Sequence, residues 1–116
     1  MDVDMKPETQ ALPIVCNMNV FTPEERENHI QTTTQLFQTV QDIQETENGY
    51  EFIFPYSNSP EKFKQFAEFI YNERRCCPFL EFTLKISPKD DPISLSLTGP
   101  EGTKEFLHEE FSEAFS

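Results

Sequence analysis

The chain has 116 residues, a length that predicts one domain burying enough surface to fold without disulfides or a structural metal. Its 21 acidic and 9 basic residues give a net charge of -12 at pH 7, and this charge disfavours binding to nucleic-acid phosphates or anionic lipid headgroups. No apolar run approaches the roughly 20 residues that span a bilayer, and the first ten residues lack the features of a secretory signal. We therefore expect a cytoplasmic protein whose thiols are mostly reduced.

The N-terminal part of the chain predicts a leader and then a strand. Residues 1–10 are expected to form a flexible leader, and residues 11–116 a single domain. Apolar side chains alternate with other residues from Leu12 to Met18, which predicts a short first strand. Pro13 confines this strand to a sheet edge or a strand start, because proline donates no backbone hydrogen bond.

A helix and a hairpin are expected next. The segment Thr22-Pro23-Glu24-Glu25 is a capping box with proline at the first helical position, so it predicts a helix over residues 23 to 38. Asn48-Gly49 is the strongest turn signal in the chain and predicts a hairpin. Its arms are residues 40–46 and 50–56, the second with aromatic residues at alternate positions.

The second half of the chain repeats this pattern. Ser59 predicts the start of a helix over residues 60–76, which a proline two residues further on brings to an end. Alternating apolar residues predict strands over 80–86 and 93–98, and Gly99-Pro100 opens a last helix. The order β-α-β-β-α-β-β-α predicts an α+β domain, with helices packed on one face of an antiparallel sheet and the other face largely polar.

The most distinctive segment is Arg74-Arg75-Cys76-Cys77-Pro78, where the second helix gives way to a strand. Successive side chains of an extended backbone point in opposite directions, so we expect one cysteine to face the core and the other to face outward. A bent turn would instead bring the two thiols together. The simplest interpretation makes one cysteine a small buried hydrophobe and gives the other no particular role.

A second interpretation is capture of a soft metal ion. Thiolates prefer Cu(I), Zn(II) and related ions, and Cys16 supplies a third sulfur beside Cys76 and Cys77 if its segment lies next to the helix end. His29 and His108 are candidate fourth ligands, although each is more readily interpreted as a solvated surface residue. The chain has no Cys-x-x-Cys pairs, so a closed structural zinc site is not predicted.

A third interpretation is redox sensing, through a Cys76–Cys77 disulfide or a bond from either to Cys16. We assign Arg74 and Arg75 to cofactor binding, since their charges favour the thiolate form of the neighbouring cysteines. The negative end of the helix dipole acts in the opposite direction. Both arginines also stabilise a helix end whether or not the cysteines are functional.

The chain resembles a family of small, mostly uncharacterised bacterial proteins. The resemblance lies in residues 73–82, which match an E-R-x-C-C-P-F core, and in residues 93–107, which contain an L-T-G-P-x-G ending. Members also carry an early cysteine, here Cys16, a long helix, and a strand that begins with Gly-Tyr, here residues 49–52. The similarity covers residues 14–107. Relatives occur near or within metal-responsive regulators, so the resemblance implies thiol–metal chemistry.

Two functions therefore remain open. The first is a cytoplasmic protein that binds or senses a thiophilic metal ion through Cys76 and Cys77, together with Cys16. The alternative is a non-catalytic interaction module with structural cysteines, which pairs with a second copy of itself or with another protein through its sheet. No residue set identifies a reaction, so we assign no catalytic residues.

Overall fold

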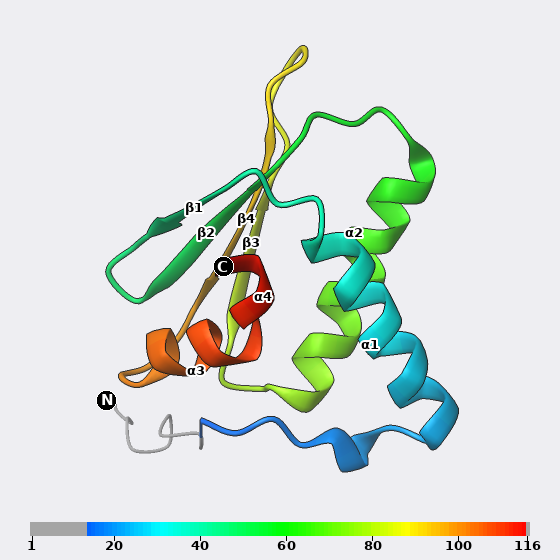
Figure 1. Cartoon of the computed structure of the whole chain (residues 1–116), viewed down its shortest axis with the longest axis vertical. Coiled ribbons are helices and arrows are strands. Elements are labelled where there is room, and N and C mark those ends of the chain that lie inside the picture. Colours follow the sequence, from blue (N-terminus) through cyan, green and yellow to red (C-terminus); the bar gives the residue numbers. More distant parts are fainter. Residues whose placement is uncertain (1–13, 116) are drawn as a thin grey trace, which may run out of the picture.

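A four-stranded antiparallel sheet carries two long helices in the computed structural model (Figure 1). The structure describes residues 14–115, and the predicted leader at residues 1–10 lies outside them. The strands are β1 (Asp42–Glu45), β2 (Gly49–Phe54), β3 (Glu81–Lys85) and β4 (Ile93–Thr98), in the spatial order β1-β2-β4-β3. The helices are η3 (Met18–Val20), α1 (Pro23–Phe37), α2 (Pro60–Cys76), α3 (Thr103–Glu110) and α4 (Ser112–Phe115). The predicted α+β class is confirmed.

Helix α1 begins at the predicted capping box. The Thr22 hydroxyl oxygen accepts a hydrogen bond from the Glu25 backbone N–H at 3.1 Å, and the Glu25 carboxylate accepts one from the Thr22 N–H at 3.0 Å. Each bond satisfies a backbone donor that the first helical turn leaves unpaired. The helix therefore starts where the sequence predicts.

Replacing Thr22 with alanine is expected to lower the free energy of unfolding by about 1 kcal/mol, because the hydroxyl acceptor of the capping box is lost. Urea denaturation monitored by circular dichroism measures this change. Thr22→Ser keeps the acceptor and serves as the control. Equal stability of the alanine and serine variants would contradict the assigned cap.

Helix α2 also has the predicted boundaries. The Ser59 hydroxyl oxygen accepts from the Lys62 N–H at 3.4 Å, Pro60 occupies the first turn, and the helix ends at Cys76. Arg74 and Arg75 lie in its last turn, where positive charge complements the helix dipole. Within residues 14–115, no helix has the length and apolar character needed to cross a membrane.

The core between helices and sheet is aromatic, as the twelve phenylalanines predict. Phe37, at the end of α1, lies at its centre. The centroid of its ring is 5.1 Å from that of Phe52, 5.7 Å from Phe54, 5.1 Å from Phe69 and 4.5 Å from Phe111. This one side chain therefore joins α1 to β2, to α2 and to the C-terminal helices.

Four of the five predicted strands are present, with small differences at their ends. The 93–98 strand is β4, which pairs with β2 on one side and β3 on the other and buries its alternate apolar side chains. The predicted 80–86 strand is shorter as β3, in which Leu84 is 37% exposed; Ile86, just beyond its end, is 55% exposed. β3 is an edge strand, and the hairpin end that it shares with β4 extends beyond the helices (Figure 1).

The predicted first strand is wrong over its described part, residues 14–18. Residues 15–17 are irregular and lead into η3, because the Asn17 side chain accepts a hydrogen bond from the Asn19 N–H at 3.1 Å and caps a 3₁₀ turn. The segment pairs with no strand of the described sheet and instead passes the C-terminal end of α2 (Figure 1). Leu12 and Pro13, which belong to the same prediction, lie outside the described residues.

Candidate metal centre

The end of α2 places two thiols side by side. Cys76 is the last helical residue, and Cys77 caps the helix with φ -126° and ψ 70°. Its N–H donates to the Glu73 carbonyl oxygen at 2.8 Å, and its own carbonyl oxygen accepts from the Leu80 N–H at 3.1 Å. These bonds bend the chain into a turn, so the two sulfurs are 3.6 Å apart.

The expectation that one of these cysteines faces outward is therefore wrong. Both Cys76 and Cys77 are fully buried, with no exposed surface. Successive side chains diverge only where the backbone is extended, and ψ at Cys77 is too small for a regular strand. The turn after the helix, which the sequence analysis considered as an alternative, is what the structure shows.

Cys16 completes a group of three sulfurs. The Asn17 N–H donates to the Cys76 carbonyl oxygen at 2.8 Å and holds the segment before η3 against the end of α2. The sulfurs of Cys16, Cys76 and Cys77 all lie within 4.8 Å of one another, and all three cysteines are free thiols. Cys16 is half-buried and lies 3.6 Å from the Met18 sulfur. We call Cys16, Cys76 and Cys77 the trithiol cluster.

A buried carboxylate lies beside the trithiol cluster. Glu73 is 1% exposed and precedes Cys76 by almost one turn of α2. The Cys77 sulfur is 3.5 Å from Glu73 Oε2, and the Cys76 sulfur is 3.8 Å from Oε1. Each thiol has one proton, which it can donate either to this carboxylate or to a neighbouring sulfur, so Glu73 is an alternative acceptor on the helix side of the cluster.

His29 is the second partner of Glu73. Its Nε2 atom is 2.8 Å from Glu73 Oε1, and the ring is only 4% exposed. The ring lies between Phe21 and Phe69, with centroid distances of 5.4 and 5.9 Å. The interpretation of His29 as a solvated surface residue is therefore wrong, because α1 presents this residue to the same core as Leu36.

The spacing of residues along α2 indicates that Glu73 is buried. Phe66, Phe69, Glu73 and Cys76 are the buried residues of α2, and their separations of three, four and three residues place them on one helix face. An acidic residue on this face indicates a buried charge, which requires a partner.

A second group of donor atoms overlaps the first. His29, Glu73 and Cys76 offer one nitrogen, one oxygen and one sulfur within 4.8 Å of one another. In the described part of the chain, His29 Nδ1 is buried and has no hydrogen-bond partner. Cys76 belongs to both groups, so five donor residues from three segments surround one small volume.

This donor set fits a soft or borderline metal ion. Thiolates select Cu(I) and Zn(II), and imidazole suits zinc and copper. Zinc–sulfur bonds of about 2.3 Å separate two sulfurs of a tetrahedral site by about 3.8 Å, which is close to the 3.6 Å between Cys76 and Cys77. The protein thus holds two sulfurs near metal-binding spacing and the third within reach.

The three thiols differ in their affinity for protons. The pKa of Cys16 is lowered, mainly because the thiols of Cys76 and Cys77 donate hydrogen bonds to its sulfur. The pKa values of Cys76 and Cys77 are raised, first by this donation to Cys16 and then by burial and the Glu73 charge. The half-buried thiol is therefore the first to become a thiolate, with two protonated thiols beside it.

The two arginines assigned to cofactor binding differ in exposure and in contacts. Arg74 is exposed. The Arg75 guanidinium donates to the Val20 carbonyl oxygen at 3.0 Å, lies 3.6 Å from the Glu25 carboxylate, and is 4.8 Å from the centroid of the Phe21 ring. Arg75 thus fastens the segment that carries Cys16 to the end of α2.

His108, the other candidate fourth ligand, lies outside both donor groups. It is exposed on α3, and the centroid of its ring is 4.4 Å from that of Phe115. The structure therefore gives His108 a packing contact at the C-terminus.

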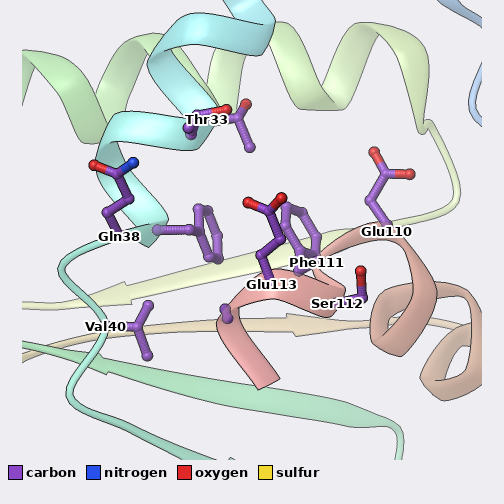
Figure 2. Close-up of a pocket in the computed structure, with 10 residues that line it drawn as sticks. Thr33, Gln38, Val40, Glu110, Phe111, Ser112 and Glu113 are labelled. Carbon is purple, nitrogen blue, oxygen red and sulfur yellow. The ribbon is translucent and has the colours of Figure 1, made fainter. Parts of the chain in front are cut away.

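A cavity of about 620 Å³ lies between the end of α1 and the α3–α4 corner (Figure 2). Phe37 and Phe111 line it, and no cysteine does. Figure 2 shows Glu110 at one side of the cavity, pointing toward the C-terminal turns of α2. Although Glu110 is an exposed residue, partial burial of its carboxyl group, with repulsion from Glu73 and Cys16, raises its pKa to about 7.

Comparison with known proteins gives no match to a family model, to a curated protein or to a solved structure. The resemblance to the bacterial family therefore remains a prediction, and the functional argument rests on the cluster itself.

Proposed function

We propose that this chain binds or senses a thiophilic metal ion through Cys16, Cys76 and Cys77, with Cu(I) and Zn(II) as the candidate ions. The observation that supports this most is the approach of three free thiols from two distant segments to within 4.8 Å. Packing alone brings apolar atoms together, but three convergent sulfurs also form a ligand set for soft ions. In the cytoplasm, where we place the protein, these thiols stay reduced.

The proposed role of His29 and Glu73 depends on the ion. Cu(I) is satisfied by sulfur ligands, whereas Zn(II) takes four ligands and needs a nitrogen or oxygen in addition to three sulfurs. His29 and Glu73 lie close enough to supply it. For Cu(I) they act instead as outer partners that orient the thiols.

The proposed sensing role depends on the location of the three ligands in two separate segments of the chain. Cys16 lies on the irregular segment before α1, while Cys76 and Cys77 lie at the end of α2. An ion bound by all three joins these two segments, which are otherwise connected by the Asn17–Cys76 bond and by the contacts of Arg75. Metal loading thus changes how firmly the N-terminal segment is held.

Separate substitution of the three cysteines tests the proposal. Cys16→Ser, Cys76→Ala and Cys77→Ala are each expected to weaken Cu(I) binding by at least about a hundredfold, because each removes one sulfur ligand. Anaerobic competition against a chromophoric Cu(I) chelator measures the affinity. His108→Gln, which changes a donor outside the cluster, is the control and should keep the wild-type affinity.

The alternative, an interaction module with structural cysteines, is supported by the complete burial of Cys76 and Cys77 in the core. It predicts that the alanine variants lose folding cooperativity and that the wild-type protein takes up no ion. Near-ultraviolet circular dichroism and thermal melting of the same variants separate the two functions. Variants that remain folded but no longer bind metal support the metal site.

A further inference from the structure

We infer that the trithiol cluster is built for a trivalent thiophilic element, of the class of arsenic(III) or antimony(III), which forms three bonds to sulfur. This inference rests on the proposed metal-binding function and narrows it to a ligand class. It is supported by the number of sulfurs, by the burial of Cys76 and Cys77, and by the carboxylate of Glu73 beside them.

The first argument is charge. Three thiolate ligands bring three negative charges, so Cu(I) leaves a complex with a formal charge of two negative, Zn(II) leaves one negative, and a trivalent centre leaves none. Cys76 and Cys77 have no exposed surface, and a buried charge without compensation is costly. A neutral complex is therefore the one that this site accommodates most readily.

The surroundings of the cluster strengthen this argument. Glu73 is buried with an oxygen 3.5 Å from the Cys77 sulfur, so any negative charge left on the complex meets a second one, which only a protonated His29, 2.8 Å from the other Glu73 oxygen, offsets. The Arg75 guanidinium, in the last turn of α2, is directed to Glu25 and to the Val20 carbonyl oxygen. The chain as a whole also carries a net charge of -12, which adds no compensation.

The second argument is the number of ligands. A trivalent element of this class carries a lone pair and takes three sulfur ligands in a pyramid, and the cluster offers three sulfurs. Zn(II) needs a fourth ligand. The three sulfurs do not supply it, so His29 through its unpartnered Nδ1 atom, or Glu73 through Oε2, would have to join them.

The binding reaction balances without an oxidant or a reductant. Arsenic enters as neutral arsenous acid, As(OH)₃. Each of the three thiols loses its proton and forms one As–S bond. Each proton joins one hydroxide that leaves the arsenic, so three waters are released. Arsenic stays trivalent throughout. Cys76 and Cys77, already 3.6 Å apart, form two of the bonds, and Cys16 forms the third.

Titration of the reduced protein with sodium arsenite under anaerobic conditions tests this inference. Native mass spectrometry should show one arsenic per chain, with a mass gain equal to arsenic minus three hydrogens, and the count of thiols reactive with a chromogenic disulfide should fall to zero. Arsenite should also displace Zn(II) from the zinc-loaded protein, and a chromophoric chelator detects the released ion. Cys16→Ser should retain arsenic on two sulfurs with at least about a hundredfold lower affinity.

The outcomes separate this inference from the proposed function. Binding of Cu(I) or Zn(II) together with full thiol reactivity in arsenite would overturn the trivalent assignment and leave the metal site standing. Failure of all three ions to bind would overturn both. Loss of only two thiols in the wild-type protein would contradict the three-sulfur site.

A charge variant tests the electrostatic argument directly. Glu73→Gln keeps the shape of the side chain and removes its charge, so Zn(II) affinity is expected to rise about tenfold while arsenite affinity stays the same. His108→Gln is the control on a remote residue. A fall in Zn(II) affinity would mean that Glu73 is itself a ligand and would overturn the account of charge.

Discussion

Replacing His29 with alanine is expected to lower the free energy of unfolding by at least about 3 kcal/mol. Glu73 is 1% exposed, and His29 Nε2 lies 2.8 Å from its carboxylate. Removing the ring leaves a buried acidic group without this partner and opens a cavity between Phe21 and Phe69. Both effects destabilise the folded state.

Urea denaturation of the wild-type and variant proteins measures this loss. His108→Ala is the matched control, since it removes an exposed histidine and is expected to change stability by less than about 1 kcal/mol. Adding Glu73→Gln to His29→Ala should restore part of the stability, because the unpaired charge disappears. The stability cost of Glu73→Gln is compared in the wild-type protein and in His29→Ala. Equal costs would show that the two residues are not coupled and would contradict the pairing.

Gly49→Ala is expected to lower the free energy of unfolding by about 3 kcal/mol, because β2 and β4 meet too closely there for a side chain. A Cβ atom at this position would lie 2.8 Å from the Thr98 Cα and closer still to the Leu97 carbonyl oxygen. These are backbone atoms of the paired strand, so a rotamer change cannot relieve the clash.

Thermal and urea denaturation of Gly49→Ala check this prediction. Glu51→Ala, on the same strand and half-buried, is the control and is expected to have a much smaller effect. A Gly49→Ala protein as stable as the control would show that β2 and β4 separate easily at this end, contrary to the register described above.

Local signals predicted most of the secondary structure. The caps at Thr22 and Ser59 mark real helix starts, and the Asn48-Gly49 turn joins two paired strands. Each of these signals depends on hydrogen bonds between residues close in sequence, which a single sequence displays directly. The predicted C-terminal helix is divided into α3 and α4, and α3 begins at Thr103, slightly later than expected, because Gly102 adopts a φ of 101° before it.

The candidate site was less predictable because it depends on contacts between distant residues. Alternation around Cys16 suggested a strand, but the bond from Asn17 to the end of α2 determines where this segment lies. The approach of Cys16 to Cys76 was a hypothesis that the structure confirms. The His29–Glu73 pair joins residues 44 positions apart, and only the helical spacing of Glu73 pointed to its burial.

The central claim is that three cysteine sulfurs hold one thiophilic ion. X-ray absorption spectroscopy at the copper edge, on reduced protein loaded with one equivalent of Cu(I) and desalted without oxygen, tests it most directly. The account predicts that copper remains bound with three sulfur neighbours, and with two in Cys16→Ser. Copper that is lost on desalting, or that is surrounded by nitrogen and oxygen, would contradict it.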